Sequence, residues 1–225
     1  MKSITVVIPA FNEEKAIQAT VKAVQKLDYI SEILVVDDGS TDETAALAEQ
    51  AGARVLKLRP NRGKGGAMNA ALQYIDTDIV AFIDADLGGC AEQVGLILKP
   101  IINEEADLAI AAFPPAQKKG GFGLVKNTAR RAIKKAGQIE VISPLSGQRA
   151  MTRKVLMAVT PFREAYGVEL GMTLRALQKG FKLVEVPTTM THNETGRDLK
   201  GFMHRGRQFI DVIKVIIAES GGKKQ

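Results

Sequence analysis

A regular alternation of short apolar runs with longer polar or amphipathic segments is the feature that most constrains the fold of this chain. The apolar runs lie at residues 4–8, 33–36, 55–58 and 78–83 and are rich in Val and Ile. Such runs are typical of strands buried on both faces of a parallel sheet. Four of these units in succession predict an α/β fold with a mostly parallel central sheet, flanked by helices and joined by right-handed connections.

Helix signals occupy the segments between the predicted strands. Asn12 and Ser40 stand at expected helix starts, where a side-chain oxygen can cap the first turn. A glycine-rich turn at residues 63–66 precedes an expected helix over 67–75. Further along we expect strands at 108–112 and 182–186 and helices at 122–135, 167–179 and 198–218. No repeat or linker divides the 225 residues, so we expect a single domain.

Polar side chains follow all four of the first predicted strands. In chain order they are Asn12, the pair Asp37 and Asp38, the pair Asn61 and Lys64, and the pair Asp84 and Asp86. The carboxyl ends of parallel strands lie at one edge of a sheet, and ligands bind in the crevice outside that edge. The sequence therefore predicts a single polar ligand site to which several strands contribute.

The segment Asp84-Ala85-Asp86 is the centre of this predicted site. Residues two apart on an extended chain point the same way, so both carboxylates could address one point. Like charges held that close repel, and the neighbouring sequence offers no obvious cation. A divalent metal bound by hard oxygen ligands would resolve both problems. A strand end followed by a turn, where Asp is common, would explain the same residues without a metal.

Composition limits the cellular compartments and the classes of binding partner that can be expected for this protein. One cysteine, Cys90, excludes an internal disulfide, and the chain shows neither a signal-peptide pattern nor the run of about 18 apolar residues that a membrane span needs. We therefore expect a cytoplasmic protein. The net charge of +6 favours anionic partners. With 5% aromatic residues and no Trp, the chain lacks a base-stacking platform, so we expect no nucleic acid binding.

Four motifs in this order resemble the family 2-like nucleotide-sugar glycosyltransferases of the GT-A fold, a Rossmann-like fold. They are VIPAFNEE at 7–14, VVDDGSTD at 35–42, NRGKGGA at 61–67 and DAD at 84–86, and they cover roughly the first hundred residues. In the second half, SGQR at 146–149, YGVE at 166–169 and His192 look closest to the glucosyl-3-phosphoglycerate synthase type. These later motifs also share features with polyprenyl-phosphate glycosyltransferases.

The resemblance implies a metal-dependent enzyme that moves a sugar from a UDP- or GDP-sugar to an acceptor. It implies a donor-binding half at residues 1–112 with contacts from Pro9, Ala10, Asn12, Glu13, Asp38, Ser40, Lys64, Asp84 and Ala85. Lys64, in a glycine-rich turn before a helix, suits a diphosphate. The implied ligands of Mg²⁺ or Mn²⁺ are Asp84, Asp86 and His192. Simple helix capping by Asn12 and Ser40, a surface turn at Lys64 and an isolated exposed His192 are the plainer alternatives.

The acceptor half, residues 113–225 with a C-terminal helix, is implied to receive a phosphorylated small molecule or a polyprenyl phosphate. Its implied contacts are Gly147, Arg149 and Tyr166. Glu169 joins Asp86 as a catalytic residue, either removing the acceptor proton or orienting a substrate. The basic segment at 118–135 could attract that acceptor, could rest on an anionic membrane through its apolar side, or could be a solvated helix.

Two other functions are compatible with the same layout. A nucleotidyltransferase shares it, but usually carries a Gly-rich, Arg-containing loop after the first strand, where this chain has Ala10-Phe11-Asn12-Glu13. A non-catalytic protein that binds nucleotide sugars or anionic lipid would bind donor without turnover. Peripheral contact with the inner face of the membrane and a homodimer are left open.

Overall fold

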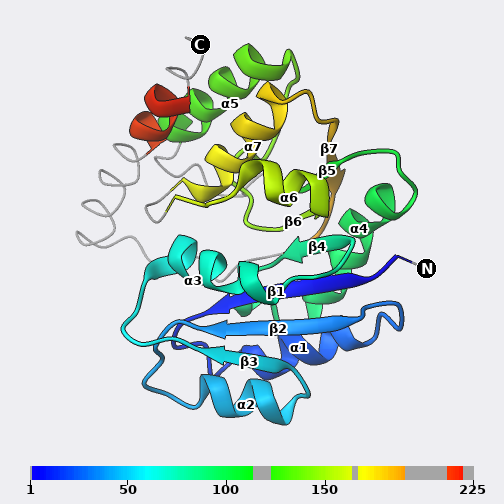
Figure 1. The fold of residues 1–225 in the computed structure, drawn as a ribbon, viewed down its shortest axis with the longest axis vertical. Coiled ribbons are helices and arrows are strands. Elements are labelled where there is room, and N and C mark those ends of the chain that lie inside the picture. Colours follow the sequence, from blue (N-terminus) through cyan, green and yellow to red (C-terminus); the bar gives the residue numbers. More distant parts are fainter. Residues whose placement is uncertain (1, 114–122, 164–166, 191–211, 220–225) are drawn as a thin grey trace.

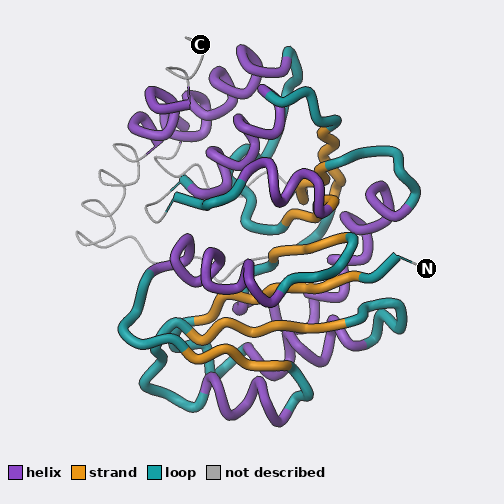
Figure 2. The backbone as a smooth tube through the Cα atoms, in the orientation of Figure 1, coloured by secondary structure: helices purple, strands orange, loops and turns teal. Residues whose placement is uncertain are grey.

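The structure is a computed structural model that describes residues 2–113, 123–163, 167–190 and 212–219. It forms a sheet with helices on both faces (Figures 1 and 2). The strands are β1 (Ile4–Ala10), β2 (Glu32–Asp37), β3 (Arg54–Lys57), β4 (Ile79–Phe82), β5 (Leu108–Ala112), β6 (Arg149–Thr152) and β7 (Leu183–Pro187). The helices are α1 (Ile17–Gln25), α2 (Thr44–Gln50), α3 (Gly63–Ala71), α4 (Val94–Ile102), α5 (Gly123–Gly137), α6 (Arg153–Val159) and α7 (Val168–Gln178), with short 3₁₀ segments η1 (Leu72–Tyr74) and η2 (Ala85–Gln93). Residues 212–219 are also helical.

The strand order is β3-β2-β1-β4-β6-β5-β7, which confirms the predicted mostly parallel sheet. Only β6 among these seven strands runs against its neighbours, pairing antiparallel with both β4 and β5. Strand β6 and helices α4 and α6 were not predicted from the sequence. Strand β6 begins with Arg149 and has no β-branched run, so its sequence does not carry the usual strand signal.

Alternating side chains of the strands divide the core between the two faces of the sheet. Val6 and Ile8 of β1 pack in one cluster with Ile17 of α1, whereas Val7 packs in the other with Met68 of α3. Each cluster joins one face of the sheet to the helices that cover that face. Successive side chains of a strand point to opposite faces, which explains why neighbouring residues of β1 belong to different clusters. No helix in the described part of the chain is long and apolar enough to cross a membrane.

Three predicted helix starts differ from the structure. Helix α1 begins at Ile17 and α2 at Thr44, and neither is capped by Asn12 or Ser40. Asn12 instead adopts a left-handed backbone conformation with φ of 55°, and its side chain turns to the neighbouring loop. The glycine-rich stretch from Gly63 is the first turn of α3 and not a separate turn, so Lys64 lies within the helix.

Candidate active site

The carboxyl ends of the first strands meet at one edge of the sheet. Ala10 pairs with Asp37, and Asp37 pairs with Lys57, so β1, β2 and β3 end side by side. The arrowheads of these strands point to the same side in Figure 1. Phe82, the last residue of β4, pairs with Arg149, the first residue of the antiparallel β6. The loop before β6 therefore reaches the same edge as the loop after β4.

Reciprocal hydrogen bonds join the loops that follow β1 and β2. The Asn12 backbone N–H donates to Ser40 Oγ at 2.9 Å, and the Thr41 N–H donates to Asn12 Oδ1 at 2.9 Å. Asp38, only 3% exposed, accepts a 2.8 Å hydrogen bond from the Arg62 N–H and so ties this pair of loops to the start of α3. Pro9 and Ala10 are residues of β1. Of the predicted donor residues, Asn12, Ser40 and Asp38 thus lie in segments that hydrogen bonds hold together.

Lys64 lies between two carboxylates from distant parts of the chain. Its Nζ is 2.7 Å from Asp84 Oδ1 and 2.9 Å from Glu169 Oε1, and Gln148 Nε2 donates to Asp84 Oδ2 at 3.0 Å. The sequence next to Asp84 offers no obvious cation, but the fold brings Lys64 to it from α3. Burial opposes charging of Lys64, but Glu169 and Asp84 outweigh it and raise the pKa of the ammonium above its ordinary value.

We expected Asp84 and Asp86 to lie on one extended segment, but they do not. Asp84 has extended dihedrals (φ −77°, ψ 150°), whereas Asp86 already belongs to the first turn of η2. Ala85 and Leu87, on either side of Asp86, are both buried. Both acids still influence Glu13: burial, and then the charges of Asp86, Asp42 and Asp84, raise the pKa of its carboxyl.

This acidic edge has the chemistry of a hard-cation site. The charges of Asp84 and Asp86 both act on the Glu13 carboxyl, and carboxylate oxygens are the ligands that Mg²⁺ and Mn²⁺ prefer. Within the described residues no three His, Cys, Asp or Glu side chains form a complete metal site. His192 and Tyr166 lie outside the described residues, so their predicted contacts stay predictions.

Arg149 occupies a different place from the one expected. Its side chain is fully buried, and its Nη2 donates to the Ser146 carbonyl at 2.6 Å while Nη1 donates to the Glu169 carbonyl at 2.9 Å. Burial lowers the pKa of the guanidinium to about 10, against the carboxylates of Glu169 and Asp84. Arg149 therefore fixes the loop before β6 against the first turn of α7 and supports the site from beneath. Gln148, which contacts Asp84, was not singled out from sequence although it stands between Gly147 and Arg149.

Gly147 is packed directly against the Lys64–Asp84 pair. A Cβ at this position would lie 2.7 Å from Lys64 Nζ and 2.7 Å from Asp84 Oδ2. We expect Gly147→Ala to separate this ion pair and to reduce turnover about 10-fold or more, because small displacements at a reacting centre are costly. Steady-state kinetics would measure the loss, with Gly89→Ala as control, since a Cβ there meets nothing within 4 Å. Wild-type turnover in Gly147→Ala would contradict the assigned packing.

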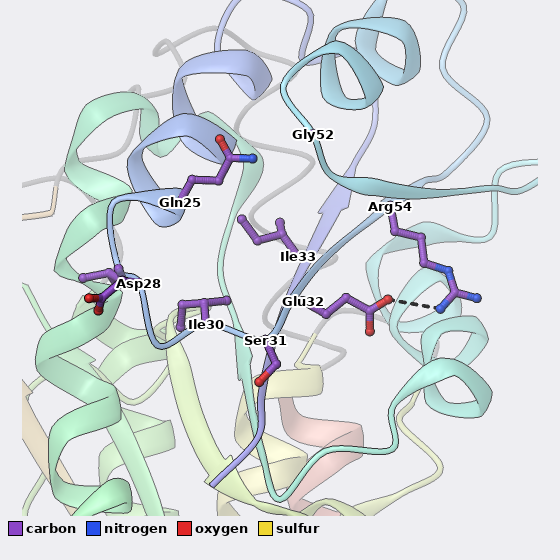
Figure 3. Close-up of a pocket in the computed structure, with 9 residues that line it drawn as sticks. Gln25, Asp28, Ile30, Ser31, Glu32, Ile33, Gly52 and Arg54 are labelled. Atoms are coloured by element: carbon purple, nitrogen blue, oxygen red, sulfur yellow. Dashed lines mark hydrogen bonds and ion pairs between the residues drawn. The ribbon is translucent and has the colours of Figure 1, made fainter. Parts of the chain in front are cut away.

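Two other surfaces can be set apart from this site. The apolar side of α5, which membrane binding would use, is buried: Val125, Ala129 and Ile133 pack with Leu170 and Leu174 of α7. A hollow of about 360 Å³ lies at the amino ends of β2 and β3, the opposite edge of the sheet (Figure 3). Its polar side chains serve the fold, as in the 3.1 Å pair between Glu32 and Arg54.

Comparison with known proteins agrees with this geometry. Residues 5–160 match the model of the family described as glycosyl transferase family 2. The glucosyl-3-phosphoglycerate synthase of Mycolicibacterium smegmatis is 32% identical over 191 residues, covering 76% of this chain and 63% of the relative. An uncharacterised protein of Methanocaldococcus jannaschii is 33% identical, and the match covers 95% of this chain and 89% of that protein.

Solved structures show the same fold. The glucosyl-3-phosphoglycerate synthase of Mycobacterium tuberculosis, crystallised with Mn²⁺, UDP and phosphoglyceric acid, superposes with a TM-score of 0.81 at 28% identity. The alignment covers 98% of this chain and 79% of that one. The chain spans less than two thirds of the curated sequence from M. smegmatis that it matches.

Proposed function

The chain belongs to glycosyl transferase family 2, and from that premise we propose that it transfers glucose from UDP-glucose to a phosphorylated acceptor of the phosphoglycerate class. The observation that carries this proposal is the meeting of Lys64, Asp84 and Glu169 at the edge where β1–β4 end, with Asp86 two residues after Asp84 in the sequence. Relatives named glucosyl-3-phosphoglycerate synthase, one of them crystallised with UDP-glucose and phosphoglyceric acid, support the choice of substrates.

Asp84 and Asp86 are proposed to hold Mn²⁺ or Mg²⁺, with His192 as a further ligand. When bound, the metal supplies positive charge that stabilises the leaving diphosphate. Lys64, at the N-terminal turn of α3, adds a second cation beside the diphosphate. The other predicted donor contacts are Pro9 and Ala10 at the end of β1, Asn12, Glu13, Asp38 and Ser40 in the segments after β1 and β2, and Ala85 after β4. They fix the nucleotide so that the sugar carbon faces the acceptor.

Glu169 is proposed to work on the acceptor side. Its side chain is only 13% exposed, and it comes from the first turn of α7, whose main chain Arg149 fixes. From there the carboxylate can take the proton of an acceptor hydroxyl or orient the acceptor. Gly147 and Tyr166 stay predicted acceptor contacts in the half proposed for residues 113–225. Cytoplasmic localisation, peripheral membrane contact and a homodimer stay predictions.

A transfer assay tests this function. With UDP-glucose, 3-phosphoglycerate and Mn²⁺ we expect stoichiometric UDP release and a glucosylated product, and we expect EDTA to abolish both. GDP-glucose and a polyprenyl phosphate provide the donor and acceptor comparisons. Binding of UDP-glucose without product from any phosphorylated acceptor would favour a non-catalytic binding protein. Pyrophosphate release from a nucleoside triphosphate and a sugar phosphate would identify a nucleotidyltransferase instead.

A further inference from the structure

The ammonium of Lys64 forms an ion pair with Asp84, a carboxylate that is proposed to bind the metal. Asp84 Oδ1 lies 2.7 Å from Lys64 Nζ, and Asp84 Oδ2 accepts from Gln148 Nε2 at 3.0 Å. Both carboxylate oxygens of this ligand are therefore already engaged within the protein. The Lys64 charge is also shared with Glu169 at 2.9 Å, so the cation is held from two sides.

A divalent ion cannot take Asp84 Oδ1 while the ammonium remains there. The two cations would repel each other at contact distance in a partly buried site, where the repulsion is stronger than in water. Metal binding to the protein alone must therefore displace Lys64 from Asp84. That displacement leaves the ammonium without one of its two anionic partners, which makes it unfavourable.

A diphosphate removes this obstacle because it offers Lys64 a new anionic partner. Lys64 is the second residue of α3, a helix of 9 residues, and the first turn of a helix favours a bound phosphate through its free N–H groups. The lysine side chain keeps 36% of its surface exposed, compared with 13% for Glu169. An anion arriving from solvent can thus reach the ammonium while Glu169 stays shielded.

We propose that Lys64 is a resident cation that closes the metal site until a nucleoside diphosphate arrives, so that metal and nucleotide bind as a coupled pair. This inference rests on the proposed function, because it takes Asp84 as a ligand of the donor's metal. It assigns Lys64 a task beyond contact with phosphate: it prevents the free protein from loading the metal alone. Gly147 packs against both partners, and a Cβ there would lie 2.7 Å from Lys64 Nζ.

The test is a Mn²⁺ titration with and without UDP. Binding is measured from the loss of the electron paramagnetic resonance signal of free Mn²⁺. Wild-type protein should bind Mn²⁺ weakly alone and about tenfold more tightly with UDP. Lys64→Met should bind Mn²⁺ without nucleotide about tenfold more tightly than wild type, and UDP should enhance its binding less. Lys26→Met, which removes a positive charge that is 63% exposed and pairs with Glu92 away from this site, is the matched control and should behave as wild type.

The possible outcomes distinguish a failure of this inference from a failure of the proposed function on which it rests. Equal nucleotide-free Mn²⁺ affinity in wild type and Lys64→Met would overturn the inference, and UDP-dependent Mn²⁺ binding in both would leave the function standing. Absence of Mn²⁺ binding in both proteins, with or without UDP, would remove the metal site itself. Lys64→Gln, which keeps a hydrogen-bond donor toward Asp84, provides a second variant if Lys64→Met is poorly folded, and the same tightening is expected of it.

Discussion

Replacing Asp86 with alanine is expected to slow sugar transfer about 10³-fold or more while leaving the fold intact. Without this carboxylate the metal loses a ligand, and the charge on the leaving diphosphate is no longer stabilised. Stability should change little, because Asp86 is only half-buried and its charge raises the pKa of Glu13 nearby. Relief of repulsion among these acids should offset the packing that the Asp86 side chain provides.

The measurement is kcat/KM for UDP-glucose at saturating acceptor, together with the melting temperature of each variant. Asp76→Ala is the matched control: it makes the same change in the turn before β4, where the Asp76 side chain is 94% exposed and pairs with Arg153. That control should keep wild-type turnover. Turnover of Asp86→Ala within tenfold of wild type would remove Asp86 from the catalytic site.

Glu169→Gln is expected to lower kcat about 10²- to 10⁴-fold, the range typical of a lost general base. Glutamine keeps the shape of the side chain but cannot accept a proton from an acceptor hydroxyl. Lys64 would lose one of its two carboxylate partners, so UDP affinity with Mn²⁺ should stay the same or rise. The effect is therefore expected in the chemical step and not in donor binding.

Single-turnover kinetics and UDP titration together distinguish these steps. Glu140→Gln, at an 81% exposed position, is the control and should leave both measurements unchanged. If Glu169→Gln weakened UDP binding as much as it slowed turnover, Glu169 would belong to the donor site. That result would require a different residue on the acceptor side.

The first half of the fold could be predicted because its strands are continuous β-branched runs, which have few alternatives to burial in a parallel sheet. Strand β6 could not, because it is short, begins with a charged residue and is stabilised by pairing on both sides. Helix α4 was missed for a related reason. Its buried residues Val94, Ile97, Leu98 and Ile101 do have helical spacing, but Pro100 is unusual inside a helix and the exposed Leu96 interrupts the polar face.

The acidic part of the site was predictable because strand order alone brings Asp84 and Asp86 to the edge shared with β1 and β2. The Lys64–Glu169 contact was not, because it depends on how α7 packs against the first turn of α3. Arg149 shows the same limit. From sequence it is a charged residue beside a glycine, whereas its burial follows from tertiary carbonyl partners on Ser146 and Glu169.

The central claim is that Asp84 and Asp86 hold a divalent ion that contacts the donor's diphosphate. Pulsed electron paramagnetic resonance of the Mn²⁺–UDP complex tests it most directly, because phosphorus bound near Mn²⁺ produces a resolved hyperfine coupling. We predict that coupling in the wild-type complex and its loss, together with the bound Mn²⁺, in Asp86→Asn. A Mn²⁺ signal without phosphorus coupling in wild type, or an unchanged coupling in Asp86→Asn, would contradict the claim.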